Sequence, residues 1–341
     1  MRILVTGGAG FIGSEFVRQT LESYPRDEVV VLDKLTYAGN LANLEPVAGD
    51  PRYGFVHGDI EDRATVAQVM GGVDAVVNFA AETHVDRSIL EPDAFVRTDV
   101  HGTWVLAEAA RASGVERFVQ VSTDEVYGAV ETGASRETDR LDPTSPYSAA
   151  KAGGELLVLA SHKTFGLPAL VVRGANAFGP YQYPEKLIPV HITNALDDQP
   201  LPVYGDGQQR RQWTHVADFV SGVDTVLRSG ETGRIYNVGN PQPESELPAN
   251  VEVSRRILGL LGKPESLLQF VVDRPAHDRR YRVDVGRLLG LGWRPRWRFW
   301  EALAATVEWY VANQDWWRPI KAGRRHQEYY ARNYAHRSAL R

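Results

Sequence analysis

The chain has 341 residues, 43% of them hydrophobic and 24% charged, and a formal net charge of −5. This composition is typical of a globular protein, and the negative charge gives no general attraction to nucleic acid or an anionic membrane, so we expect neither as a partner. No cysteine is present, which excludes disulfides, thiolate metal sites and cysteine nucleophiles. We expect a strand from residue 2 and find no apolar run near the roughly 20 residues that span a bilayer, which predicts a cytoplasmic location without signal peptide or membrane segment.

A glycine-rich turn follows the first expected strand. Arg2–Thr6 has the pattern of a buried strand, and Gly7-x-x-Gly10-x-x-Gly13 leads into a helical stretch over 14–23. Glycines allow a tight turn and close approach of a pyrophosphate, which then faces the helix N-terminus. A glycine turn without a ligand is the alternative. The dinucleotide contacts predicted in this turn are Gly7, Gly10, Phe11, Ile12 and Gly13.

An acidic residue ends the second expected strand, Glu28–Asp33. A carboxylate there accepts hydrogen bonds from the ribose hydroxyls and repels a 2′-phosphate, so Asp33 predicts NAD rather than NADP as the cofactor. Lys34, next to it, acts weakly against that choice. The alternative is an aspartate that only caps a turn.

Strands and helices keep alternating to about residue 176, with further strands expected at 55–59 and 75–80. This alternation predicts an α/β fold with a doubly wound parallel sheet of the Rossmann type. We expect Asp59 and Ile60 near an adenine ring, and Ala80, Ala81 and Glu82 at the border of the cofactor. Loop packing is the alternative for both segments.

Polar side chains are concentrated at 83–88, just beyond the fourth strand. This is the side of the sheet where a polar substrate would lie, so His84 and Ser88 are candidates for substrate contacts. The alternative is a network that caps the next helix. Since this segment has one histidine without spaced partners, we predict no metal site.

An acidic pair stands where the strand Arg117–Val121 ends, followed by Thr123, Asp124 and Glu125. Ligands of open α/β sheets bind at this edge. Two carboxyls in unlike environments can divide into a protonated acid and an ionised base. The alternative is a turn residue next to a solvated charge.

A second chemical motif follows about twenty residues later. Ser145 is an expected helix N-cap and Pro146 the first helical residue, so Tyr147 and Lys151 share one helix face. An ammonium near a phenol favours the phenolate, which would lower the tyrosine pKa and make it a usable base. This spacing also occurs on ordinary helix surfaces, but beside the acidic pair it suits oxidation followed by elimination.

The regular alternation stops after 169–176, where prolines become frequent. Because 234–239 has the pattern of another strand of the main sheet, we expect a smaller α/β substrate lobe interleaved with the first domain. The predicted division is a Rossmann domain over 1–177 to which 212–239 returns, a nucleotide-sugar lobe over 178–211 and 240–320, and a C-terminal tail over 321–341.

Two further expectations concern the C-terminal part. The basic run 321–325 is expected to be a solvated feature of the tail. Apolar residues at helical spacing are expected to be core rather than cofactor contacts: Trp300, Leu303, Val307 and Val311.

Several motifs together resemble a known family. Gly7-x-x-Gly10-x-x-Gly13, Tyr147-x-x-x-Lys151 and the segment 173–180 resemble the extended short-chain dehydrogenases that act on nucleotide sugars. Within that group, the segments 122–128, 181–189 and 273–281 are similar to the dTDP-glucose 4,6-dehydratase family. The likeness covers nearly the whole chain.

The resemblance implies a role for each catalytic candidate. Tyr147 would be the base for the C4 hydroxyl of the sugar, and Lys151 would lower its pKa and hold the nicotinamide ribose. Thr123 would hydrogen-bond the sugar, Asp124 would protonate the departing C6 hydroxyl, and Glu125 would take the C5 proton. The family also implies NAD as cofactor, dTDP-glucose or a related nucleotide sugar as substrate, and a homodimer.

The resemblance further implies substrate contacts in the second lobe. Family positions that hold the nucleotide diphosphate or the sugar match Asn176, Lys186, Leu187, Pro202, Tyr204, Arg211, Asn250, Arg274 and His277. The departures from the family pattern are Ala177, Phe178, Gln212, Ala276 and a longer segment over 241–249. They concern nucleotide or sugar preference more than chemistry, and the choice between thymine and uracil stays open.

Three functions compete at this stage. The leading one is NAD-dependent 4,6-dehydration of a nucleotide-activated glucose. A nucleotide-sugar 4-epimerase would share the glycine turn, Tyr147 and Lys151, but has no need for an acid and a base at C6 and C5. A non-catalytic NAD-sensing regulator would have no need for an intact catalytic set.

Overall fold

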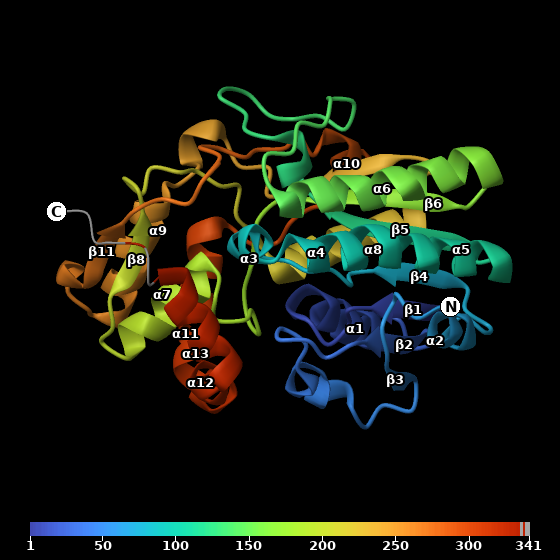
Figure 1. The fold of residues 1–341 in the computed structure, drawn as a ribbon, viewed down its shortest axis with the longest axis horizontal. Coiled ribbons are helices and arrows are strands. Elements are labelled where there is room, and N and C mark those ends of the chain that lie inside the picture. The colour runs from blue at the N-terminus through green and yellow to red at the C-terminus, as the bar shows by residue number, and fades with distance from the viewer. Residues whose placement is uncertain (335–336, 338–341) are drawn as a thin grey trace.

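The computed structural model describes residues 1–334 and 337. Its centre is a seven-stranded sheet in the order β10-β6-β5-β4-β1-β2-β3 with every pair of neighbours parallel (Figure 1). The strands are β1 (Arg2–Thr6), β2 (Glu28–Asp33), β3 (Tyr53–His57), β4 (Ala75–Asn78), β5 (Arg117–Thr123), β6 (Ala169–Gly174) and β10 (Ile235–Val238). The expected doubly wound sheet is confirmed, and the strand expected over 234–239 is β10, which pairs with β6 at one edge.

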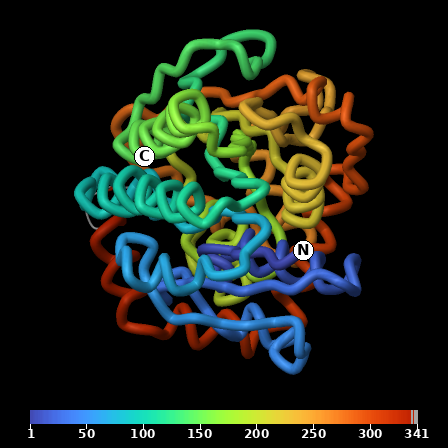
Figure 2. Tube along the Cα trace, turned by 90° about the vertical axis from the view of Figure 1, so that its right-hand side faces the viewer, coloured from blue at the N-terminus to red at the C-terminus, as the bar shows by residue number. Residues whose placement is uncertain are grey.

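Helices cover both faces of this sheet because its strands are apolar on both sides. On one face, α1 (Phe11–Ser23) packs on α8 (Val216–Ser229), and their buried side chains join those of the strands in one core. On the other face lie α2 (Arg63–Val69), α5 (Thr103–Ser113) and α6 (Pro146–Phe165). Figure 2 shows the teal α5 and the green α6 side by side in this second layer. Buried parallel strands of this kind bind ligands at their carboxyl ends.

Short elements connect these layers and form the smaller lobe. Next to the sheet lie α3 (Val85–Leu90), α4 (Pro92–Phe95), the π-helical turn η2 (Val96–Gly102) and the 3₁₀ turn η3 (Asp124–Tyr127). The lobe contains α7 (Leu187–Leu196), α9 (Asn250–Leu261), α11 (Phe299–Ala312) and two parallel strand pairs, β8 (Leu201–Tyr204) with β11 (Leu268–Val271) and β7 (Ala177–Phe178) with β9 (Thr214–His215). An aromatic core that includes Phe178, Trp213 and Trp317 holds it together. The domain boundaries given above stay a prediction.

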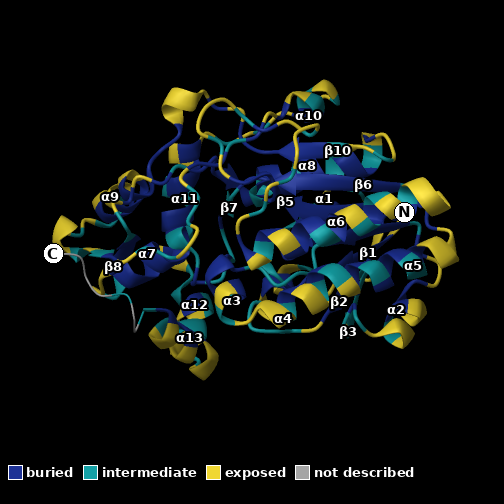
Figure 3. Cartoon of the chain, turned by 45° about the horizontal axis from the view of Figure 1, so that its top comes forward, coloured by how far each residue is buried: buried dark blue, intermediate teal, exposed yellow. Residues whose placement is uncertain are grey.

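The apolar stripe predicted in α11 is only half correct. Leu303 and Val307 are buried, but Trp300 and Val311 are 41% and 43% exposed. The buried face is rotated because Phe299, one residue before the predicted stripe, packs into the aromatic core. Figure 3 shows exposed patches on the outer faces of many of the helices.

The segment predicted as a C-terminal tail is helical in the part that the structure describes, and only part of its basic run is exposed. Residues 321–334 form the end of α12 (Gln314–Ala322) and the helix α13 (Arg324–Tyr334), and α13 buries His326 and Tyr329. Lys321 is not simply solvated, because its Nζ donates to Asn194 and to Asp197 at 3.1 and 2.9 Å. The buried face of α13 consists of Tyr, His and Asn, so it carries no aliphatic periodicity. Residues 335–336 and 338–341 of the predicted tail lie outside the described residues.

Two further observations bear on function. No helix within the described ranges is both long enough and apolar enough to cross a membrane. Across the same part of the chain, no group of three or more His, Asp or Glu side chains is arranged to hold a metal ion.

Candidate active site

A large cavity lies at the carboxyl ends of β1, β2, β4, β5 and β6 and extends to the smaller lobe. It brings together nearly every residue predicted for the site. From the first domain these are Gly7, Gly10, Phe11, Ile12, Gly13, Asp33, Asp59, Ile60, Ala80, Ala81, His84, Thr123, Asp124, Glu125, Tyr147 and Lys151. From the later part of the chain they are Asn176, Lys186, Leu187, Pro202, Tyr204, Arg211, Asn250, Arg274 and His277.

Ser88 is the exception, and its predicted substrate contact is wrong. The side chain is fully buried and does not line the cavity. Its Oγ donates to the Val85 carbonyl at 2.7 Å, one turn back in α3. Ser88 therefore serves the helix, as in the capping alternative for this segment.

The glycine turn is a close-packed cradle at the start of α1. A Cβ on Gly7 would lie 2.6 Å from the Ala80 nitrogen, and a Cβ on Gly13 would lie 2.3 Å from the Gly7 carbonyl oxygen. Gly10 is the N-cap of α1 and makes no side-chain cap, so the first amides of the helix face the cavity without a competing side chain. The residues present fit a pyrophosphate at this helix terminus.

Asp33 is held by two backbone amides at the end of β2. Its Oδ2 accepts from the Ala9 nitrogen at 2.9 Å and its Oδ1 from the Leu35 nitrogen at 2.8 Å, which orients the carboxylate beside the turn. The Lys34 ammonium is 2.5 Å from Asp59 Oδ2 and 3.8 Å from Glu61. Because Lys34 is already paired with two carboxylates, it offers little charge to a 2′-phosphate.

The acidic pair lies in two different environments. Asp124 is 2% exposed, and burial together with the nearby Glu125 charge raises its pKa to about 8. Glu125 is only partly buried, and its backbone nitrogen donates to Thr123 Oγ1 at 3.2 Å, which fixes the turn after β5. Asp124 therefore keeps its proton at neutral pH, while its neighbour stays accessible from the cavity.

Tyr147 and Lys151 lie on the first turns of α6, where Ser145 and Ser148 form a capping box. Lys151 Nζ donates to the Val121 carbonyl at 2.8 Å. The predicted lowering of the Tyr147 pKa is wrong for the chain alone: burial, followed by the charges of Glu125 and Asp99, raises that pKa well above its usual value. The ammonium is directed at a carbonyl, so it offsets little of this effect.

Asp99 is a neighbour of this pair that the sequence analysis missed. It lies in the π-helical turn η2, is 1% exposed, and accepts from the Glu82 nitrogen at 3.0 Å. Burial raises its pKa to about 7, against the opposing effect of the Lys151 charge. No sequence motif at 96–102 indicates that Asp99 takes part in the chemistry of the site.

Three cations from the later part of the chain line the cavity. Lys186 Nζ donates to the Thr83 carbonyl at 2.6 Å, and Arg274 lies 3.7 Å from the Asp86 carboxylate. Arg211 donates to the Asp278 carbonyl at 2.9 Å. These cations can meet an anionic substrate such as a diphosphate.

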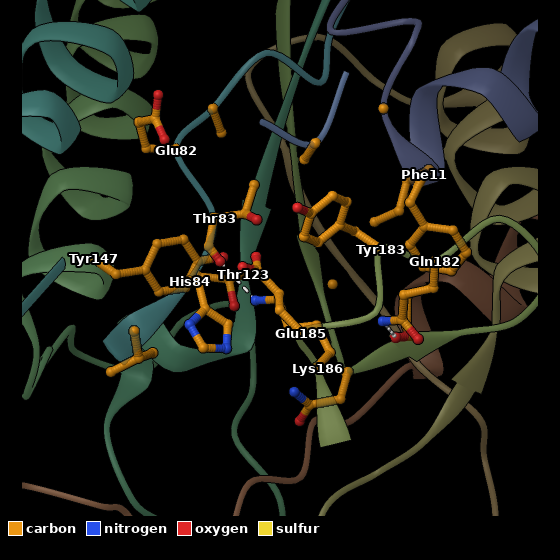
Figure 4. Close-up of a pocket in the computed structure, with 18 of the residues that line it drawn as sticks. Phe11, Glu82, Thr83, His84, Thr123, Tyr147, Gln182, Tyr183, Glu185 and Lys186 are labelled. Atoms are coloured by element: carbon orange, nitrogen blue, oxygen red, sulfur yellow. Dashed lines mark hydrogen bonds between the residues drawn. The ribbon is translucent and has the colours of Figure 1, made fainter. Parts of the chain in front are cut away.

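Figure 4 shows how side chains from distant segments converge here: Tyr147, Thr123 and His84 lie opposite Phe11 and Tyr183 in this view, with Glu185 and Lys186 between them. Several lining residues were not predicted: Gln182, Tyr183, Glu185 and Tyr334. Gln182, Tyr183 and Glu185 belong to the family motif 181–189, which is a signal that could have found them. Tyr334 lies in the segment interpreted as a tail.

The departures from the family pattern have structural roles. Gln212 is buried and bridges two segments, because its Nε2 donates to the Asn240 carbonyl at 2.6 Å and its Oε1 accepts from the Val283 nitrogen at 2.8 Å. Phe178 is fully buried in the aromatic core of the smaller lobe. Ala276 has φ of 50°, in the left-handed region that favours glycine.

Comparisons with known proteins agree with this geometry. The family model described as GDP-mannose 4,6 dehydratase matches residues 4–306. A dTDP-glucose 4,6-dehydratase from Streptomyces niveus is 51% identical over 94% of this chain and 96% of its own length. A crystal structure of a dTDP-glucose 4,6-dehydratase from Streptomyces venezuelae with NAD and TYD bound is 50% identical, with a TM-score of 0.91 over 94% of this chain and 100% of that one. The same enzyme from Bacillus anthracis, in complex with NAD, is 44% identical with a TM-score of 0.87 over 94% and 100% of the two chains.

Both the family model and these relatives cover far more of the chain than the glycine turn and the Tyr147/Lys151 pair alone. They include the acidic pair after β5 and the cation-rich lobe. The chain therefore belongs to the dTDP-glucose 4,6-dehydratase family.

Proposed function

We propose that the protein is an NAD-dependent hydro-lyase that converts dTDP-glucose to dTDP-4-keto-6-deoxyglucose. The single observation that carries this proposal is the burial of Asp124, which raises its pKa, next to the more accessible Glu125, with Tyr147 and Lys151 in the same cavity. An epimerase acting at C4 would have no use for this acid and base. A sensor would not need them beside a tyrosine base.

The residues around the glycine turn fit NAD. The close-packed glycines admit a pyrophosphate at the helix terminus, and Asp33 presents a carboxylate that two amides orient. Relatives crystallised with NAD support the same cofactor. The pairing of Lys34 with Asp59 supports NAD over NADP.

When bound, the nicotinamide would accept the hydride from C4 of the sugar and later return it to C6. Tyr147 takes the proton of the C4 hydroxyl, aided by the positive charge that the oxidised ring brings to this buried site. The C4 ketone acidifies the C5 hydrogen, which Glu125 removes. Asp124 gives its proton to the C6 hydroxyl, which leaves as water.

The substrate end of the cavity supports a nucleotide diphosphate. Lys186, Arg211 and Arg274 supply the positive charge, and Tyr204 supplies an aromatic face beside them. The relatives are dehydratases of dTDP-glucose, which favours thymine as the base.

The deciding experiment is incubation of the purified protein with dTDP-glucose and UDP-glucose in parallel, with the base-dependent absorbance of the 4-keto sugar as the readout. We expect product with dTDP-glucose and little with UDP-glucose. Nucleotide released on denaturation should be NAD. Absence of a keto sugar from both substrates would refute the proposal, and formation of a C4 epimer would identify an epimerase.

We also propose a homodimer, as the family resemblance implies. Leu156 and Phe165 on the outer side of α6 are 52% and 59% exposed, and Val96 on the adjoining η2 is 57% exposed. Apolar side chains of this size on two packed elements suit a subunit interface. Light scattering after size exclusion would give the mass. The expected cytoplasmic location stays a prediction.

A further inference from the structure

The helix α13 makes a direct contact with a predicted substrate residue. The Tyr329 hydroxyl lies 2.8 Å from Nδ1 of His84, and their rings meet edge to face with centroids 5.7 Å apart. Both side chains are at most 9% exposed. His84 lines the cavity, so a residue 245 positions later in the chain touches the wall of the substrate site.

Tyr329 is held rigidly in this place. The Arg87 guanidinium stacks on its ring at 3.8 Å and on the Tyr37 ring at 3.6 Å. Arg87 also donates through Nε to Glu185 at 2.9 Å. A guanidinium enclosed by two rings and a carboxylate leaves the phenol little freedom to turn.

The direction of this hydrogen bond follows from the protonation of the Tyr329 hydroxyl. Burial raises the pKa of Tyr329 far above neutrality, so its hydroxyl keeps a hydrogen that needs an acceptor. Within the described residues, that hydroxyl forms its hydrogen bond with Nδ1 of His84. The hydroxyl therefore donates and Nδ1 accepts.

The charge of the His84 ring then decides which of its nitrogens carries a hydrogen. Burial lowers the pKa of His84 well below its usual value, and the cations Lys186, Arg274, Arg87 and Arg337 lower it further. The Asp86 carboxylate is 3.8 Å from Nδ1, beyond hydrogen-bond distance, and is itself paired with Arg274 and Arg337. A neutral imidazole carries one hydrogen, and with Nδ1 as the acceptor that hydrogen is on Nε2.

We propose that Tyr329 is a positioning residue that fixes the tautomer of His84, so that Nε2–H is presented to the cavity as a donor to an acceptor oxygen of the nucleotide sugar. This inference rests on the proposed function for its ligand. The assignment of the tautomer does not depend on that function.

The first test measures the tautomer itself. The chain has nine histidines, so protein labelled with ¹⁵N in its histidine rings gives a tractable spectrum, and the His84→Asn variant assigns the His84 signals. We expect Nε2 of His84 to carry the hydrogen in the parent protein. In Tyr329→Phe, the two ring nitrogens should move toward averaged shifts. A parent protein with the hydrogen on Nδ1, or an unchanged spectrum in Tyr329→Phe, would overturn the proposal.

The second test measures the consequence for the substrate. Tyr329→Phe should raise KM for dTDP-glucose about 2- to 10-fold, the size of one neutral hydrogen bond, with kcat within about twofold of the parent. In the His84→Asn background the same change should add nothing, because the ring that it orients is gone. An unchanged KM beside a changed tautomer would refute the donor role.

A matched control is the next residue of the same helix. The Tyr330 hydroxyl accepts from Asn194 Nδ2 at 3.0 Å, on α7. Tyr330→Phe loses one hydroxyl from α13 but leaves His84 untouched, so its ring spectrum and KM should match the parent. An equal rise of KM in both variants would indicate that Tyr329 acts only through the stability of α13, which also overturns the proposal. If no dTDP-glucose is turned over, the ring spectra still decide the tautomer while the proposed function fails separately.

Discussion

Two regions of the cavity differ in how their residues are brought together. At the carboxyl end of β5, the acidic pair and Tyr147 come from neighbouring segments of one α/β unit, and the contacts that fix them span a few tens of residues. At another part of the cavity wall, α13 reaches His84 through Tyr329 and Tyr204 through Asn333, which donates to the Tyr204 hydroxyl at 3.1 Å. The first region is fixed by local structure, whereas the second depends on the whole chain having folded.

This difference predicts different failures when each region is damaged. Substitutions after β5 should abolish chemistry and leave the fold intact, because the backbone there is held by the sheet. Substitutions in the wall should weaken folding or substrate binding and leave the chemistry intact.

The largest expected effect is that of Tyr147→Phe. The change removes the proton acceptor for the opening oxidation and little else, so kcat should fall about 10²- to 10⁴-fold while dTDP binding is kept. Turnover assays and titration calorimetry with dTDP measure the two quantities. Tyr53→Phe on β3, outside the cavity lining, should stay near the parent rate. A Tyr147→Phe rate within twofold of the parent would contradict the assignment.

The wall should respond most strongly to Arg87→Met. Glu185 would be left buried without its cation, which typically costs about 3–5 kcal/mol of unfolding free energy. Burial raises the pKa of Glu185 above its unfolded value, so the folded protein loses stability as pH rises and this carboxyl becomes charged. The difference in unfolding free energy between the parent and Arg87→Met should therefore be larger at pH 8 than at pH 5. Urea denaturation at both pH values measures it.

The control for that experiment is an exposed ion pair between α13 and the residue that follows α3. Arg332 lies 2.7 Å from Glu91, but both side chains are more than half exposed. Arg332→Met should therefore cost under about 0.5 kcal/mol. Equal losses in the two variants would show that burial of the Arg87 pair is not what holds the wall.

The sequence predicts the first region well because its signals are local. The glycine turn, the strand ending before Thr123 and the capped helix at Ser145 each follow from a few adjacent residues, and the doubly wound parallel sheet follows from the alternation of strands and helices. The resemblance to the dehydratase family added the roles. Ser88 was misplaced because a hydroxyl near a strand end can equally well bond its own helix.

The second region carries no such local signal. α13 buries His, Tyr and Asn rather than aliphatic residues, so no apolar periodicity distinguishes it from a solvated tail. Asp99 owes its raised pKa to burial against α6, and burial is a property of packing that its neighbours at 96–102 do not reveal. The direction of the Tyr147 pKa was wrong for the same reason, since only the fold shows that Lys151 is directed at Val121.

A finer comparison lies within the acidic pair. With its pKa raised to about 8, Asp124 can donate a proton below that pH, so elimination in the parent should slow as pH rises through about 8. Asp124→Asn should keep C4 oxidation, slow the loss of water at least about tenfold and lose that pH dependence. Glu125→Gln should instead slow exchange of the C5 hydrogen. Stopped-flow absorbance of NADH and deuterium exchange separate the two steps, and parental rates in both variants would show that the pair is structural.

The smallest expected effect concerns Ala276, where the chain departs from the family glycine. Its φ of 50° places an L side chain in the left-handed region between two predicted substrate residues, Arg274 and His277. Left-handed backbone costs a non-glycine residue roughly 1–2 kcal/mol, and the greater freedom of glycine in the unfolded chain recovers only part of this difference. Ala276→Gly should therefore raise the unfolding free energy by about 0.5–1 kcal/mol and leave kcat unchanged.

The sign of that change distinguishes relief of strain from a general effect of glycine. Ala67 is exposed in the interior of α2, where its backbone is helical, so Ala67→Gly should lower the unfolding free energy by about 1 kcal/mol. Thermal unfolding of both variants under one condition compares them directly. Opposite shifts in Tm would locate strain at the wall of the substrate site, on the side of the molecule that long-range contacts assemble. A lower Tm in both variants would mean that the segment around residue 276 tolerates alanine without strain. The loss of the family glycine would then carry no cost in stability.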